Sequence, residues 1–551
     1  MEATIKTANQ PTDQSEGDPA DPFVGDRADP SGIPAEDKPI DKPWLKWVIA
    51  ITVSFAAILE VVDSSIVNVA LPDMQGNLGA TLSEIGWVIT GYGIATAIMI
   101  PLTAWLGDFF GRKRYFLFSL IGFTIASVFC GFATNLPMLV TGRIIQGLCG
   151  GGLIAKAQSI LFETFPKEEQ GMAQALFGVG VIVGPVIGPT LGGFLTDTLG
   201  WRWIFFINIP FGILAITMAA LFLPNHNERK ATVVDWLGIG LLVLCIGSLQ
   251  TVLEQGQQED WFSSKFILAL TIAGVIGFCA FILQELRTKA PAVNLRVLKH
   301  RALTGGSVYS LVLGMGIYGA TFAVPIFCQN ILHYTAMQTG MLMLPSALAS
   351  GLMMPVIGKM SGKVDPRLMI GGGAIGSAIS MFILASINPD TSPDTMFWPL
   401  LLRGAASVFM FMSLSMASVG ALPKADIPDG SGIYNLSRQI GGSLGIAIIT
   451  LVLDQREAFH RAMLVANYSM YNPLFRDRLS AMTGGFQVHT MDFNVAQSQA
   501  IASLNGMLNM QASILSFADI FRMVGVAFII SLPLLFLLGK PAKNGEAISA
   551  H

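Results

Sequence analysis

The sequence predicts an all-α polytopic membrane protein with fourteen transmembrane spans, and composition, hydropathy and charge placement support this fold class. Hydrophobic residues make up 52% of the 551 residues and charged residues only 13%, whereas about a quarter of the residues of a soluble domain are charged. Apolar runs recur from Trp44 to Leu538, and many approach the roughly 20 residues that cross a hydrocarbon core. Lys and Arg gather in alternate loops between these runs.

The apolar runs define the spans and their direction. An even number of spans puts both termini on one side, and the positive-inside rule assigns that side to the cytoplasm of an inner membrane. The first 43 residues are polar and rich in Asp and Pro, so we expect a disordered cytoplasmic tail and not a signal peptide. A second cytoplasmic tail covers 541–551. We expect spans near 48–70, 84–106, 115–134, 137–162, 171–196, 203–223, 234–253, 266–284, 303–328, 338–358, 367–387, 396–421, 431–454 and 514–538.

A weak internal repeat divides the chain into two parallel halves. The second span ends in TAWLGDFFGRKR and the tenth in GKMSGKVDPR, while the fourth and twelfth each place an Arg early in the membrane. We therefore expect six-helix halves at 44–223 and 303–540, with two inserted spans and a cytoplasmic linker at 224–302. Parallel halves around a central site are typical of transporters. One large external loop, 455–513, lies before the last span.

Several classes of function find no support in the sequence. There is no nucleotide-binding GxxxxGK[ST] motif, no nucleophile and base pair, and no metal-ligand spacing among the cysteines and histidines. We expect neither an enzyme nor a nucleic-acid-binding protein. We also expect no metal and no cofactor.

Several motifs occur in an order that resembles one family. They are LEVVDSSIVNVALP (59–72), AWLGDFFGRKR (104–114), RIIQGLCGG (143–151) and NLSRQIGGSLG (435–445). The chain resembles the fourteen-span drug:H⁺ antiporters of the major facilitator superfamily, the EmrB/QacA-like multidrug efflux permeases, over about 44–540. The resemblance implies the major facilitator fold and export by alternating access, with the proton motive force as the source of energy.

The turn after the second span and one later Arg are candidate gating elements. The resemblance implies a cytoplasmic gate at Asp108, Gly111, Arg112 and Lys113, although Ala104 and Phe109 depart from the family pattern. We expect Arg112 and Lys113 to reach helix ends and Asp108, unless they serve only as anchors on the positive side. Arg438, in the last motif, is the further gating candidate.

The stretch GVGVIVGPVIGPTLGG (178–193) is similar to the antiporter motif of the fifth span. Glycines every four residues form a ridge that allows close helix approach, and prolines permit a bend. We expect this face to move against a helix of the other half; the alternative is static tight packing. The gating candidates here are Gly180, Gly184, Pro185, Gly188, Pro189 and Gly192.

Charges at membrane depth are costly and usually functional. Glu60 and Asp63 share one face of the first span, and Arg143 in the fourth span lies at the depth of Asp63 at ~1.5 Å per residue. We expect these three residues to form the proton-coupling site, with Glu60 the more easily protonated acid. The alternative is that both acids are structural and bond to Ser64, Ser65 or Asn68.

Five other ionisable groups lie in the spans or at their ends. We leave open whether Lys156 lines the cavity or extends to the membrane surface, and no role is assigned to Arg403. Glu254, Glu285 and Arg522 lie at span ends, where we expect solvation.

The function that we expect is proton-coupled export of amphipathic drugs or toxic compounds. The alternatives are a dedicated exporter of a siderophore, antibiotic or other metabolite, and a receptor or scaffold that transports nothing. The resemblance implies a periplasmic adaptor protein and an outer-membrane channel as partners beside membrane lipids, with 455–513 as the docking segment or as a solvated loop with a surface helix. The polar residues expected in the substrate cavity are Tyr92, Gln146, Gln158, Tyr318, Gln329 and Asn435.

Overall fold

The computed structural model describes residues 43–224 and 234–538, apart from 387, 389, 390, 467, 490 and 491. Within these residues, 14 helices are long and apolar enough to cross a membrane, and no strand is formed. The expected all-α fold class and span number are therefore confirmed. The two terminal tails, apart from Pro43, and the loop that carries Arg229 and Lys230 lie outside the described residues.

The first half consists of six spans built from eight helices. Two of the spans are each made of two consecutive helices, α4 with α5 and α7 with α8. The helices are α1 (Pro43–Leu78), α2 (Leu82–Phe110), α3 (Arg112–Gly131), α4 (Leu136–Gly150), α5 (Leu153–Thr164), α6 (Lys167–Leu199), α7 (Trp203–Phe206) and α8 (Asn208–Phe222).

The inserted pair and the second half complete the fold. The inserted helices are α9 (Trp236–Gln255) and α10 (Lys265–Arg287), and four short 3₁₀ turns connect elements of this part (Trp261–Ser263, Leu295–Lys299, Lys424–Asp426 and Leu532–Leu537). The second half contains α11 (Arg301–Asn330), α12 (Ala336–Met360), α13 (Pro366–Leu384), α14 (Pro393–Ser418), α15 (Ile427–Val465), α16 (Pro473–Gln487) and α17 (Phe493–Ser531).

Local sequence explains where several helices begin. A helix leaves its first N–H groups without partners, and polar side chains accept from them at α2, α4 and α9. Thr81 and Glu84 form a reciprocal capping box, and Asn135 and Asp235 cap the other two helices. The chain reverses between α2 and α3 at Gly111, whose φ of 89° suits glycine.

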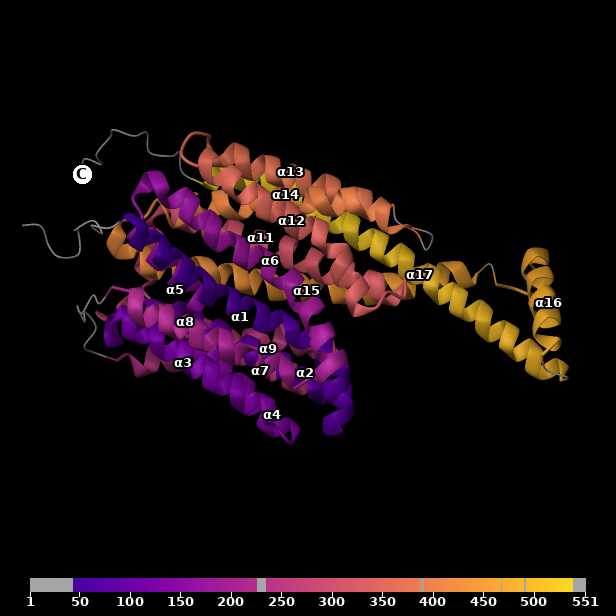
Figure 1. The fold of residues 1–551 in the computed structure, drawn as a ribbon. Helices are drawn as coiled ribbons and strands as arrows, with labels where there is room; N and C mark the ends of the chain where they lie inside the picture. Colours follow the sequence, from indigo (N-terminus) through magenta and orange to yellow (C-terminus); the bar gives the residue numbers. More distant parts are fainter. Residues whose placement is uncertain are drawn as a thin grey trace, which may run out of the picture. The chain divides into compact units, whose positions relative to one another are not determined.

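The two halves meet along several helix pairs, among them α5 with α15. α6 packs against α12, and α2 packs against α15, while the inserted α9 lies on both α2 and α15. α6, α11, α12 and α15 run close together through the middle of the molecule (Figure 1). α1, α9 and α15 end at the same end of the bundle, and beyond it α16 lies beside the first turns of α17 (Figure 1). Because α16 and α17 form a helical hairpin there, we call this end of the bundle the hairpin end.

The structure refines two of the expected elements. The fourth span, expected near 137–162, consists of two helices, because α4 ends and α5 begins at Gly151 and Gly152. The segment 455–513, expected as an external loop, is mostly helical, because α15 continues to Val465 and α17 begins at Phe493. Apolar side chains on one face of α17 pack on α16, with Leu479, Ala500 and Leu504 at the centre, and hydropathy alone ended the thirteenth span too early and began the fourteenth too late.

The glycine ridge of α6 faces a different helix from the one we expected. A Cβ at Gly184 would lie 2.7 Å from Cγ1 of Val61, and one at Gly192 would lie 2.8 Å from the carbonyl oxygen of Ile66. Both neighbours belong to α1, in the same half. The expectation of a partner in the other half was wrong, because a different side of α6 contacts α12, where Gly171 meets Gly358.

Replacing Gly188 by Leu tests this packing. A Cβ there would overlap Ser65 and lie 3.0 Å from the amide nitrogen of Ile66, and overpacking typically costs about 1–3 kcal/mol. We expect the Gly188→Leu variant to unfold at a lower temperature than the parent in detergent and to lose export. The matched control is Gly240→Leu on α9, where nothing lies within 4 Å. Equal unfolding temperatures for the two variants would show that the ridge tolerates a side chain.

Candidate functional site

A buried ion pair joins α1 to α4 in the first half. Nη1 of Arg143 lies 2.6 Å from Oδ2 of Asp63, and the two side chains are 1% and 0% exposed. The matching depth expected from the sequence is therefore realised as a direct contact. A buried pair is held by its geometry and by further hydrogen bonds, because each charge has lost its water.

Amide side chains complete the coordination of this pair. Nε2 of Gln146 donates to Oδ1 of Asp63 at 2.9 Å, and Nδ2 of Asn208 on α8 donates to the same oxygen at 2.6 Å. The Oε1 atom of Gln146 accepts from Arg143 at 2.8 Å. Asn208 also donates to Ser127 of α3 at 2.9 Å. Four helices thus contribute polar groups to one buried charge pair.

Two groups of α2 cover the guanidinium of Arg143. Its Nε donates to the carbonyl oxygen of Val88 at 3.3 Å, and its Cζ lies 3.9 Å from the centre of the Tyr92 ring. A cation over an aromatic face is stabilised most where water is excluded, and Tyr92 is only 5% exposed. Tyr92 and Gln146, which we expected in the substrate cavity, therefore belong to the ion-pair site.

Glu60 lies near this site but has a different partner. It is 3% exposed, and its Oε2 accepts from the backbone N–H of Ile154 at 3.0 Å. Ile154 is in the first turn of α5, where free N–H groups and the helix dipole attract an anion. The break between α4 and α5 thus creates the anion-binding position. Ser64 and Ser65 donate instead to backbone carbonyls, those of Val61 and Val62 among them.

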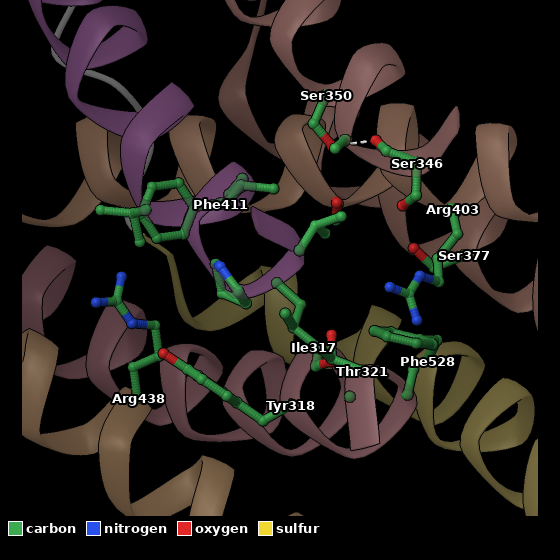
Figure 2. A pocket seen from close by; sticks show the side chains of 18 residues that line it. Ile317, Tyr318, Thr321, Ser346, Ser350, Ser377, Arg403, Phe411, Arg438 and Phe528 are labelled. Carbon is green, nitrogen blue, oxygen red and sulfur yellow. Dashed lines mark hydrogen bonds between the residues drawn. The ribbon is translucent and has the colours of Figure 1, made fainter. Parts of the chain in front are cut away.

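The second half holds a cavity lined by seven helices, α6 among them (Figure 2). Its wall combines apolar side chains with hydroxyl groups and two arginines, and Tyr318 is the one predicted cavity residue that lines it. Figure 2 shows Arg403 beside Ser377 and Phe528 on one side, and Arg438 beside Phe411 on the other.

Both arginines of the cavity carry a buried, unpaired N–H group. Nη1 of Arg403 and Nη1 of Arg438 have no hydrogen-bond partner among the described residues, although Arg438 lies 5.0 Å from the centre of the Phe411 ring. None of the described residues that line the cavity is acidic. Buried donors without partners are rare and call for an explanation, and two of them in an acid-free cavity fit an anionic group of a ligand.

Four polar side chains form a hydrogen-bonded cluster between the halves, which we call the inter-half cluster (Gln158, Ser415, Ser431 and Asn435). Nε2 of Gln158 donates to Ser415 at 2.8 Å, and Nδ2 of Asn435 donates to Oε1 of Gln158 at 2.6 Å. Oγ of Ser431 donates to the carbonyl oxygen of Ala155 at 2.8 Å. Gln158 and Asn435, predicted for the cavity, thus join α5 to α14 and α15.

The candidate gate after α2 is anchored within the first half. Arg112 forms an ion pair with Glu163 of α5, not with Asp108 as we expected, and Ser159 also donates to Glu163 at 2.8 Å. Lys113 donates to the carbonyl oxygen of Ala220 near the end of α8 at 2.8 Å, which agrees with the expected contact to a helix end. The turn therefore ties α3 to α5 and α8.

Several other predicted residues have definite positions. Gln329 is exposed near the end of α11 and does not line the cavity. Lys156 is 2% exposed and its ammonium group packs against Gly107 of α2, so it neither lines the cavity nor reaches the surface. Glu285 is 1% exposed and Oε2 of Glu254 is buried, so their expected solvation was wrong.

Asn208 is the functional residue that sequence reasoning missed. It is the one amide in the apolar run WIFFINIPFGILAI, and an isolated amide in a span is usually satisfied by another helix. That observation could have marked it as a partner of a buried charge. Its target, Asp63, lies 145 positions earlier in the chain.

Fold, span number and buried charges define a polytopic membrane transporter. The profile of the Major Facilitator Superfamily matches residues 53–446. The chain is 34% identical over 519 residues to the multidrug export protein EmrB of Escherichia coli, which covers 94% of this chain and 100% of that one. It is 31% identical over 503 residues to the fatty acid resistance protein FarB of Neisseria gonorrhoeae, with coverage of 91% and 97%.

The chain belongs to the Major Facilitator Superfamily and, within it, to the EmrB-like branch. A solved structure supports the fold: the human organic anion transporter MFSD10 superposes with a TM-score of 0.58, covering 89% of this chain and 99% of that one. At 12% identity this likeness concerns the fold alone.

Proposed function

We propose that the protein is a proton-coupled antiporter that exports amphipathic drugs or toxic compounds by alternating access. The observation that carries the proposal is the fully buried Asp63–Arg143 pair, with Glu60 three residues away on α1. A purely structural scaffold gains little from such groups, because buried ion pairs contribute little net stability. EmrB of Escherichia coli, a relative whose match covers 94% of this chain, is named a multidrug export protein.

Glu60 remains the acid that we expect to take the proton more readily, and loss of the negative charge at Asp63 would change the site in a defined way. Neutralising the carboxylate leaves Arg143 buried without its counter-charge, which is strongly unfavourable. The site would then relax by admitting water or substrate. A bound proton thereby favours one of two conformations, because the interaction energy of the charge pair differs between them.

The inter-half cluster supports a gate that opens and closes. Its contacts are hydrogen bonds between neutral groups, each worth about 0.5–1.5 kcal/mol net. The free energy of substrate or proton binding is large enough to break such bonds. We place this cluster toward the cytoplasmic side of an inner membrane, with both termini cytoplasmic, because the basic loops lie at that end. The conformation described here is then closed to the cytoplasm.

The cavity in the second half indicates the substrate chemistry. Its apolar walls suit a hydrophobic body, and the free N–H groups of Arg403 and Arg438 suit a carboxylate or another anionic group. We therefore propose amphipathic substrates with an acidic group as the preferred class. The same features would serve a dedicated exporter of one acidic metabolite, and the breadth of the substrate range separates the two functions.

The helical segment beyond the hairpin end suits a docking role. Tyr471 and Leu474 near the start of α16 are 97% and 79% exposed, and Val488 just after its end is 81% exposed. We propose that α16 and its flanking residues contact a periplasmic adaptor protein, which in turn joins an outer-membrane channel. Large exposed apolar side chains that gather on one element commonly mark a protein interface.

Neutralising the two acids tests proton coupling. We expect Asp63→Asn to abolish substrate-induced proton release from the purified protein and uphill export in proteoliposomes, and Glu60→Gln to reduce both. The matched control is Asp73→Asn, an exposed acid on the same helix. Because Asp63→Asn strands a buried charge, at a cost of about 3–5 kcal/mol, the double variant Asp63→Asn/Arg143→Gln should regain stability without coupling. Normal proton release from both single variants would refute the assignment.

Replacing Arg403 by Gln tests the substrate class. A hydrogen bond to a charged group is worth about 1.5–3 kcal/mol, so apparent affinity for acidic amphiphiles should fall roughly ten- to hundredfold. Neutral amphiphiles should be exported as by the parent. The measurement is the concentration dependence of export for matched acidic and neutral compounds, with exposed Arg522→Gln as the control. An equal loss for both classes would show that Arg403 acts on folding or gating instead.

Deleting 465–490, which removes α16, tests the docking role. We expect export into vesicles to continue, because α16 lies outside the bundle of spans, and whole-cell resistance to be lost. A variant with Tyr471→Ser, Leu474→Ser and Val488→Ser should lose resistance to a similar degree while it keeps the segment. Loss of export in both assays would mean that α16 supports the transporter itself.

A further inference from the structure

The inserted helix α9 is attached by its last two turns to both halves of the transporter. Nε2 of Gln255 donates to Thr90 of α2 at 3.0 Å. Nε2 of Gln250 donates to Ser443 of α15 at 2.5 Å, and Gln257, just beyond the helix, donates to Asp454 of α15 at 2.7 Å. α9 therefore bridges the α2–α15 interface on the side of the hairpin end.

Glu254 lies in the middle of this bridge. Its carboxyl group accepts from the side-chain amide of Gln250 and packs against α2, where a Cβ at Gly93 would lie 2.9 Å from Oε1. Its second oxygen, Oε2, is buried, and so is Oε1 of Gln250. Neither oxygen has a well-formed hydrogen bond among the described residues, and the hydroxyl group of Thr90 on α2 is the neighbouring donor that faces the Glu254 carboxyl.

This arrangement has more buried acceptors than donors. A carboxylate only accepts hydrogen bonds, whereas a carboxylic acid also donates one. Binding of a single proton at Oε2 converts a buried acceptor into a group that can also donate. It also removes a negative charge from an interface that provides no cation to balance it.

We propose that Glu254 is a proton-binding site, separate from Asp63, whose protonation holds the α2–α15 interface closed at the hairpin end. The proton comes from the solution at that end, and no other bond forms or breaks. When the interface opens, water reaches the carboxyl group and the proton leaves. The inference rests on the proposed function, because it assigns this step to the alternating access of an antiporter.

None of the charged groups around Glu254 competes with it as the proton-binding residue at the hairpin end of this interface. No described charged side chain is paired with it. Toward the hairpin end, the charged side chains on the neighbouring elements include Glu84 on α2, Asp454, Arg456 and Glu457 on α15, Glu259 and Asp260 after α9, and Lys265 on α10. Of these, Arg456, which pairs with Asp519, and Glu457 are half-buried, and the others are exposed. Further along the interface, Arg438 on α15 is buried, and Asp108 on α2 and Asp429 on α15 are half-buried. Glu254 alone has a carboxyl oxygen enclosed between the two halves.

The experiment measures the width of the interface against pH in the full-length protein in nanodiscs. Spin labels are placed at Asn77→Cys, at the end of α1, and at Gln455→Cys, on α15, both exposed positions, after the five native cysteines are replaced. We expect the parent to shift from a short to a longer distance as the pH rises. The variant E254Q, which resembles the protonated acid, should keep the short distance at every pH.

Two further variants make the outcome decisive. E254D keeps an ionisable group and should keep the pH-dependent shift with a displaced midpoint, whereas exposed E259Q should behave as the parent. A purely structural role for Glu254 would alter stability but leave the pH dependence in place. A parent-like shift in E254Q, or no shift in the parent, overturns the inference. The distance measurement requires no substrate, so it tests the role of Glu254 even if the parent protein shows no uphill export.

Discussion

The buried pair of Asp63 and Arg143 is the constraint on which the rest of the first half depends. The pair is buried away from solvent, so its charges are compensated by each other and by the groups around them. These groups are the side-chain dipoles of Gln146 and Asn208, the Val88 carbonyl and the Tyr92 ring. Separating α1, α4 and α8 would strand one charge in a medium that cannot solvate it. These helices therefore move together. The contacts of Lys113 with α8 and of Arg112 with α5 attach α3 to the same unit.

The contacts between the halves are of another kind. Gln158, Ser431 and Asn435 share hydrogen bonds between neutral groups, and α6 meets α12 through small residues such as Gly171 and Gly358. Neutral hydrogen bonds exchange readily with water, and small residues leave no interlocked side chains to separate. Strong charge pairing within a half and weak contacts between halves favour rigid-body motion over internal rearrangement.

The sequence predicts the span number well, because hydropathy and span length reflect one physical requirement, the thickness of the membrane. It also places Asp63 and Arg143 at one depth, since the helical rise is constant. Prediction from the sequence fails where the surroundings of a residue depend on which helix packs against it. The Glu254 carboxyl looks solvated at a span end until α2 and α15 enclose it, and the partner of the α6 glycines depends on how α6 is rotated. Asn208 is visible in the sequence, but its target is not.

α6 links the two sites that the fold separates. The acids lie in the first half, and the cavity with Arg403 and Arg438 lies in the second, where no described lining residue is acidic. Pro185 of α6 lines that cavity, while Gly184, its neighbour, packs against Val61, which lies between Glu60 and Asp63 on α1. A substrate that displaces α6 at Pro185 therefore presses on α1 at the acids, because Gly184 leaves no space between the helices. Interior packing transmits such shifts, so under the proposed function a ligand in the cavity would act on Glu60 and Asp63 through α6.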